Sequence, residues 1–71
     1  GVEASIFLRE QDGMYRVSLR GNGNIDLSDV SKIFGGGGHK NAAGITLKKE
    51  MPFEELKKKL IDAVINELNN G

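Results

Sequence analysis

The sequence predicts a small α/β (α+β) domain in which one sheet, begun by an antiparallel hairpin, packs against helices. Apolar and polar residues alternate on both sides of an Asp-Gly pair near the start of the chain, and apolar residues recur at helical spacing near its end. Between these regions, a run of four glycines separates a short helical pattern from a third strand. The predicted element order is therefore β-β-α-Gly loop-β-α, in a single domain over residues 1–71.

The first two strands are predicted from their alternation. Residues 2–9 place Val, Ala, Ile and Leu on one face and Glu, Ser, Phe and Arg on the other, which is typical of a half-buried strand. Asp12-Gly13 is a strong signal for a two-residue hairpin turn, and residues 14–20 alternate again. The aromatic residues are expected mainly in the core; they are Phe7, Tyr15, Phe34 and Phe53.

A short helix and a third strand are predicted next. Asp26 or Ser28 can cap the helix, and Gly35 suits the position just after its end. Its apolar residues at helical spacing are Leu27, Val30, Ile33 and Phe34. The pair Ala42-Ala43 favours either tight packing or one helical turn. The strand then contains Ile45 and Leu47.

The last predicted helix covers residues 52–69. Pro52 suits its first position, and a wide apolar stripe follows at helical spacing. The stripe consists of Phe53, Leu56, Leu60, Ile61, Val64, Ile65 and Leu68. The run Lys57–Lys59, preceded by Glu54 and Glu55, predicts a solvated face with ion pairs three and four residues apart.

Composition narrows the functional class. Ten basic and ten acidic residues give a formal net charge of zero, which argues against a general polyanion-coating protein but leaves room for a local basic patch. No apolar run approaches the roughly 20 residues that span a bilayer, so no membrane partner is expected. The absence of cysteine is compatible with a cytoplasmic location. Because the chain starts with Gly1, not Met, we expect a piece of a longer protein.

The glycine run carries most of the functional information. Gly35–Gly38 precede His39, which is the only histidine. The phosphate-binding P-loop and the dinucleotide fingerprint both fail here on spacing. The general mechanism remains: the amides of Gly36, Gly37 and Gly38 can point at one anion, and His39 can donate to a phosphate. A helical turn over residues 40–43 would add further N–H groups. The alternative is a tight helix-to-strand crossover in which His39 caps a backbone group.

Two arginines of the second predicted strand are further candidates. Arg20 lies at the strand end and can fork onto the same phosphate as His39. Arg16 shares that face and is expected to be an exposed strand residue. With one histidine, no cysteine and no carboxylates at ligand spacing, we expect neither a metal site nor a catalytic residue. Phosphodiester hydrolysis normally needs such a centre, so the chain is predicted to hold a substrate without cleaving it.

Three segments together resemble the DHHA1 domain, the C-terminal substrate-binding domain of DHH-family phosphoesterases. They are Val17–Arg20, Ile25–Val30 and Phe34–Gly44, the last with the sequence FGGGGHKNAAG. The likeness covers residues 2–68. It is strongest to bacterial oligoribonucleases and 3′-phosphoadenosine-5′-phosphate (pAp) phosphatases. Cyclic-dinucleotide phosphodiesterases, single-strand DNA exonucleases and alanyl-tRNA editing proteins share the domain.

The resemblance implies a two-domain enzyme in which an N-terminal DHH domain binds manganese and carries the catalytic centre. The present domain alone would then be inactive. The implied contacts to a nucleotide or short single-stranded RNA come from Arg20, Gly36, Gly37, Gly38 and His39. Many members carry Ser after this arginine; here Gly21 follows, so no hydroxyl contact is implied. The residues alone leave open a standalone RNA-binding module or a structural module.

Overall fold

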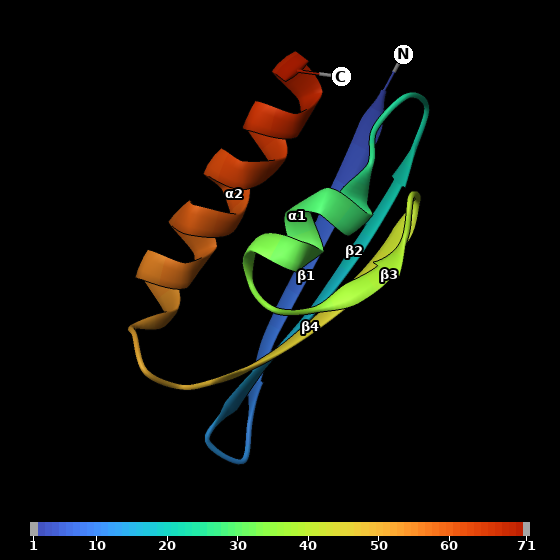
Figure 1. Ribbon diagram of the computed structural model, residues 1–71. Coiled ribbons are helices and arrows are strands. Elements are labelled where there is room, and N and C mark those ends of the chain that lie inside the picture. Colours follow the sequence, from blue (N-terminus) through green and yellow to red (C-terminus); the bar gives the residue numbers. More distant parts are fainter. Residues whose placement is uncertain (1, 71) are drawn as a thin grey trace.

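The structure, a computed structural model, describes residues 2–70. Its elements are β1 (Glu3–Gln11), β2 (Met14–Asn22), α1 (Leu27–Ile33), β3 (Gly37–His39), β4 (Ala42–Lys48) and α2 (Phe53–Asn70). The four strands form one antiparallel sheet in the order β1-β2-β4-β3, and two helices accompany it (Figure 1). The predicted fold class is confirmed. The order differs by one added strand, β3, which lies in the glycine run.

The β1–β2 hairpin has the predicted turn. Asp12 has φ 52° and Gly13 has φ 74°, and a two-residue turn with positive φ at both positions matches the right-handed twist of paired strands. The ladder closes with Gln11 opposite Met14. The tight turn fixes the register of the whole hairpin, which determines which side chains share a face.

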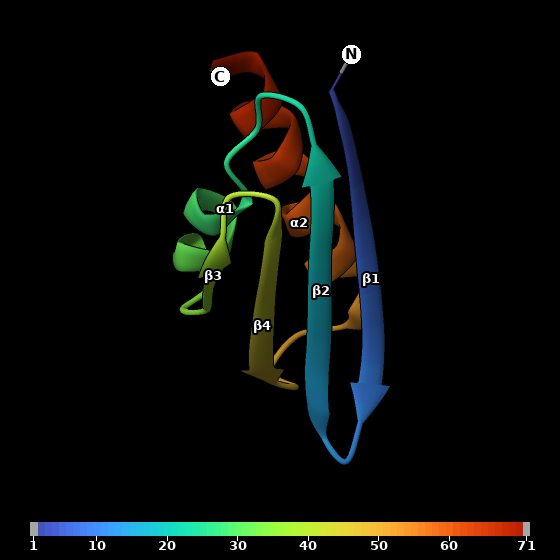
Figure 2. The same ribbon diagram turned by 90° about the vertical axis from the view of Figure 1, so that its right-hand side faces the viewer.

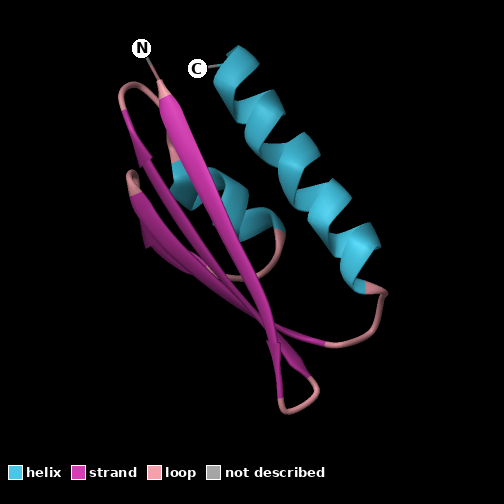
Figure 3. Ribbon diagram, turned by 180° about the vertical axis from the view of Figure 1, so that it is seen from behind, coloured by secondary structure: helices cyan, strands magenta, loops and turns pink. Residues whose placement is uncertain are grey.

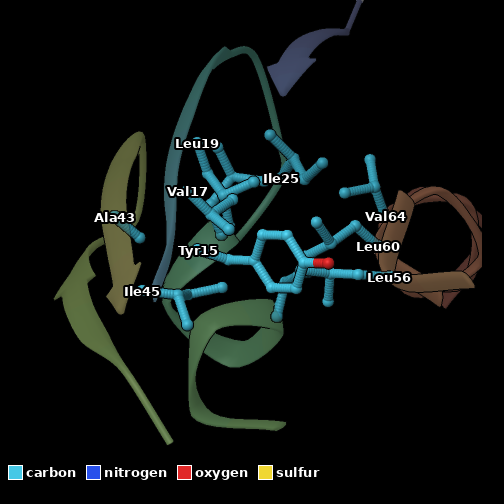
Figure 4. Packing of buried hydrophobic residues seen from close by; sticks show 11 residues of the cluster. Tyr15, Val17, Leu19, Ile25, Ala43, Ile45, Leu56, Leu60 and Val64 are labelled. Carbon is cyan, nitrogen blue, oxygen red and sulfur yellow. The ribbon is translucent and has the colours of Figure 1, made fainter. Parts of the chain in front are cut away.

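Both helices lie on the same side of the sheet. Figure 2 shows the sheet face-on with the helices behind it, so the opposite face is uncovered. Apolar side chains from β2, β4, α1 and α2 meet between the two layers (Figure 4). Tyr15 is fully buried there, and its hydroxyl donates to the Met51 carbonyl at 2.6 Å. Tyr15 is therefore a core residue, as predicted.

The apolar stripe of α2 is wider than the surface it covers. Leu56, Leu60 and Val64 are buried, whereas the flanking apolar residues are 38–48% exposed; these are Phe53, Ile61, Ile65 and Leu68. Figure 3 shows α2 running alongside β1 on one side of the sheet, and the buried residues of the helix form a single line along it. The predicted first residue, Pro52, lies just before the helix, and its carbonyl accepts from the Leu56 N–H.

The inward face of α1 differs from the prediction at two positions, Ser31 and Ile33. Asp26 is the N-cap, and its side chain accepts from the Ser28 N–H at 3.0 Å. Ser31 is fully buried, whereas Ile33 is 69% exposed. The reason is helical spacing: residues four apart share a face, so Ser31 follows Leu27 inward while Ile33 points away.

Candidate functional site

The first two glycines of the run end α1. The Gly35 N–H donates to the Lys32 carbonyl and the Gly36 N–H donates to the Ser31 carbonyl, at 3.1 and 2.9 Å. With Gly35 at φ 78°, these bonds form a Schellman cap. Gly35 thus ends the helix as predicted. Because the Gly36 amide is already bonded, the predicted cradle of three consecutive amides facing one anion is not formed.

Backbone conformation or packing explains three of the four glycines. Gly35 needs its positive φ, and a Cβ on Gly36 would lie 2.5 Å from the Gly44 carbonyl oxygen. Gly38 has φ 142°, and a Cβ there would overlap the backbone of Ala43. Gly37 is different: a Cβ there would meet nothing within 4 Å. The fold itself gives no reason for the missing side chain of Gly37.

The residues after His39 form a hairpin turn, not the helical turn considered above. Lys40 and Asn41 connect β3 to β4, so no helix N-terminus contributes N–H groups here. The Lys40 carbonyl accepts from the Leu27 N–H at 2.8 Å, and the Asn41 carbonyl accepts from the Gly21 N–H at 3.0 Å. These bonds hold the turn against the start of α1 and the end of β2. The tight-packing interpretation fits Ala43, which is buried.

Arg20 and His39 lie in one row across the sheet. Arg20 on β2 is opposite Ala42 on β4, and Ala42 is opposite His39 on β3. Two strand spacings separate their backbones, roughly 10 Å. Both residues are exposed, and the small Ala42 lies between them. The structure therefore brings together the two side chains that the sequence singled out.

The next row of the sheet has two glycines, on β3 and β4, and therefore no side chains at that end. Gly37 on β3 is opposite Gly44 on β4, and Gly44 is opposite Ser18 on β2. A Cβ on Gly44 would touch only the Val17 carbonyl oxygen, at an ordinary 3.8 Å. Neither glycine is required by packing, and together they leave bare backbone beside the Arg20–His39 row.

The uncovered face is cationic although the chain is neutral. Side chains of Arg9, Arg16, Arg20 and Lys48 project from it, because directly opposed residues share a face. Within residues 2–70, Glu3 is the one carboxylate in these rows. Arg16 is exposed on this face, as predicted. The zero net charge thus conceals a basic patch, which is the property that attracts phosphate groups.

Comparison with known families matches residues 1–70 to the DHHA1 domain. The chain belongs to the DHHA1 domain family. It is 35% identical over 71 residues to the bifunctional oligoribonuclease and PAP phosphatase NrnA of Thermus thermophilus. That alignment covers 100% of this chain and 22% of the relative. The resemblance inferred from the sequence is confirmed.

Sequence reasoning missed one residue that shapes the site of this DHHA1 domain. The buried Ser31 hydroxyl lies 3.1 Å from both the Gly37 and the Gly44 carbonyl oxygens. Ser31 therefore connects α1 to the two strands whose bare backbone adjoins the Arg20–His39 row. A polar residue at the inward spacing of a short helix, just before the glycine run, was the signal that could have identified it.

Two other candidate positions of the DHHA1 domain are explained by their surroundings. A Cβ on Gly21 would lie 3.0 Å from both the Glu3 carbonyl oxygen and Leu27 Cδ1, so the glycine fits a tight position. The lysine run Lys57–Lys59 is exposed on α2, behind the sheet, and Lys59 Nζ lies 3.7 Å from Glu55. This matches the predicted solvated face.

The DHHA1 domain shows no metal centre in its described part. Over residues 2–70, no group of three or more His, Asp or Glu side chains is placed to hold a metal ion. The manganese implied by the resemblance therefore has no fitting site among these residues. No helix within residues 2–70 has the length and apolarity needed to cross a membrane.

Proposed function

We propose that this DHHA1 domain holds a phosphate of a nucleotide or short single-stranded RNA for a phosphoesterase. The observation that carries the proposal is the Arg20–Ala42–His39 row on a cationic, uncovered sheet face. The name of the Thermus relative, an oligoribonuclease and PAP phosphatase, supports this class of substrate. A chain that spans 22% of that relative would hold the substrate while another domain hydrolyses it.

The chemistry of the row suits a phosphate. The Arg20 guanidinium is a planar fork that can donate two parallel hydrogen bonds to phosphate oxygens. The His39 ring can donate from an N–H on the other side of the small Ala42. Gly37 then lets the ligand approach the backbone closely. The proposed site differs from the predicted amide cradle, because its donors are the Arg20 and His39 side chains beside the bare backbone at Gly37. Gly36 belongs to the cap that ends α1.

The proposal also assigns the hydrolytic step to a second domain of the enzyme. The DHH domain expected from the resemblance would supply manganese and the hydrolytic step. The present domain would contribute no catalytic residue and would be inactive alone. A cytoplasmic location fits this role, because a chain without cysteine needs no oxidising compartment.

Titration of the 71-residue chain with AMP and with pAp, followed by NMR, tests the proposal. Chemical shifts are expected to change at Arg20 and over residues 36–44. Arg20→Ala and His39→Ala should each weaken binding by about tenfold to a hundredfold, because a charge-assisted bond contributes roughly 1.5–3 kcal/mol. Arg20→Lys should restore only part of the affinity, since it keeps the charge and loses the fork. Lys58→Ala on α2 is the control, with unchanged affinity.

Contrary results separate the alternatives. If the shifts of Arg20 and the glycine run do not move, the binding role is wrong. If both variants bind normally, the domain is structural. A standalone RNA-binding module would instead prefer longer strands and show a steep dependence of affinity on salt.

A further inference from the structure

The uncovered face carries one large aromatic side chain. Phe7 on β1 is 63% exposed, contrary to its expected place in the core. It lies directly opposite Ser18, in the same row as Gly44 and Gly37. A single exposed apolar residue means little by itself. The surroundings of Phe7, however, are those of a ligand site.

Arginines surround Phe7 on this face. Arg9 follows it two residues later on β1, and Arg16 and Arg20 are its diagonal neighbours on β2. Diagonal neighbours lie within reach of aromatic and long side chains. Among residues 2–70, the aromatic contact that forms joins Tyr15 to a different phenylalanine. The ring of Phe7 is therefore open to a ligand from solvent.

Arg9 and Arg16 lie directly opposite each other in the ladder. Like charges at such positions repel and destabilise a sheet. The ion pairs formed within residues 2–70 involve other side chains. An anion between the two guanidinium groups would replace this repulsion with two attractions.

A hollow lies beside Phe7 and Arg9. It measures about 630 Å³ and is lined by Ile6, Phe7, Leu8, Arg9 and Ser18. Small-molecule sites typically have volumes of roughly 300–1,000 Å³. Arg16 and Arg20 lie four residues apart on β2, about 13 Å at 3.3 Å per residue. One phosphate cannot bridge that distance, whereas a short oligonucleotide can.

We propose that Phe7, Arg9 and Arg16 form a second nucleotide subsite. A base of a single-stranded oligonucleotide stacks on the Phe7 ring, and the adjoining phosphate lies between Arg9 and Arg16. The subsite rests on the proposed function, in which Arg20 and His39 hold the first phosphate. Stacking accepts any base, because every base has a π-face. The subsite thus selects short oligonucleotides over mononucleotides without selecting their sequence.

Binding of two probes to the 71-residue chain tests the subsite. The probes are AMP and the RNA dinucleotide pApA, titrated by NMR. The chain should bind pApA more tightly than AMP. Phe7→Ala should weaken pApA binding about tenfold and leave AMP binding unchanged, whereas Phe7→Tyr should retain the affinity. Ile33→Ala removes a similarly exposed apolar side chain from α1 and should change neither.

The arginines give an independent measurement. Arg9→Gln and Arg16→Gln should each weaken pApA binding and reduce the slope of log affinity against log salt by about one. The subsite would be overturned if Phe7→Ala left pApA binding unchanged. The proposed function would still stand in that case if AMP binding required Arg20. If Phe7→Ala weakened AMP and pApA binding equally, Phe7 would belong to the first site. If Phe7→Ala changed only the association state of the chain, this face would be a protein interface. Either result overturns the subsite. If neither probe binds, both proposals are wrong.

Discussion

Gly37 and Gly44 lie directly opposite each other on β3 and β4, with no packing reason for either to lack a side chain. Glycine in a strand interior weakens the strand, because it loses more conformational entropy and buries no side chain. Two such positions side by side therefore reduce stability. Their location beside the Arg20–His39 row supports a surface kept bare for close approach of a ligand.

Substitutions in the glycine run should separate ligand binding from folding. Gly37→Ala places a methyl group in open space, so the free energy of unfolding should stay constant or rise by about 0.5 kcal/mol. Gly38→Ala meets the Ala43 backbone at a left-handed φ and should destabilise the domain by about 2 kcal/mol or more. Urea denaturation measures both. Equal stability losses would show that Gly37 is also a packing residue. AMP binding should weaken in Gly37→Ala although the fold is intact.

Ser31→Ala tests the support beneath this surface. The hydroxyl lies 3.1 Å from both the Gly37 and the Gly44 carbonyl oxygens, which share its one proton, and the side chain is fully buried. Removing it leaves these acceptors without that donor, so the free energy of unfolding should fall by about 1–2 kcal/mol. Ser5→Ala on the exposed face of β1 is the control, with a change within about 0.5 kcal/mol. An undiminished stability of Ser31→Ala would mean that the bonds do not hold the strands to α1.

The parts of the fold that were predictable have strong local causes. Asp12-Gly13 suits a turn with positive φ, and long apolar periodicity predicted α2. The strand β3 was not predictable, because a glycine run has no side-chain pattern and its extended form comes from pairing with β4. For the same reason, the sequence singled out Arg20 and His39 by residue type but could not place them in one row.

The solvent exposure of Phe7 was also not predictable from the sequence pattern. Alternation assigned Phe7 to the face shared with Glu3 and Arg9, yet alternation does not say whether a face is covered. Both helices cover the opposite face, which leaves Phe7 in solvent. The alternation placed Phe7 on the correct face of the sheet. The prediction that Phe7 is buried was wrong, because it followed the general tendency of aromatic residues to be buried.

Asp26→Ala should lower the melting temperature at neutral pH by roughly 5 °C, because the N-cap side chain satisfies an N–H of α1. Asp26→Asn keeps an acceptor and should restore most of the loss. The hydrogen bond from the Ser28 side chain holds the pKa of Asp26 below its ordinary value of 3.8. A lowered folded pKa contributes stability above pH 3.8 that is lost as the pH falls through the folded value. The advantage of Asp26 over Asn should therefore disappear in strong acid, as thermal melts at pH 7 and pH 2 would show.

Glu67 on α2 should show the opposite pH dependence. Partial burial against α1 raises its pKa above 4.5, and interactions with the Asp29 and Asp26 carboxylates raise it further. A raised folded pKa means that the stability contribution is complete below pH 4.5 and is lost as the pH rises through the folded value. At neutral pH, the charged Glu67 therefore opposes folding. Because Glu67 is partly solvated, the effect should not exceed about 0.5 kcal/mol.

Glu67→Gln removes the charge and keeps the shape of the side chain, so it should raise the melting temperature at pH 7 and leave it unchanged near pH 4. Asp62→Asn, at an exposed position on the same helix, controls for the change in net charge and should have little effect at either pH. If Glu67→Gln raised the melting temperature equally at both pH values, the gain would come from packing or helix propensity and not from the removed charge. A lower melting temperature at pH 7 would mean that the Glu67 carboxylate stabilises the contact between α1 and α2, and the repulsion inferred from Asp29 would then be wrong.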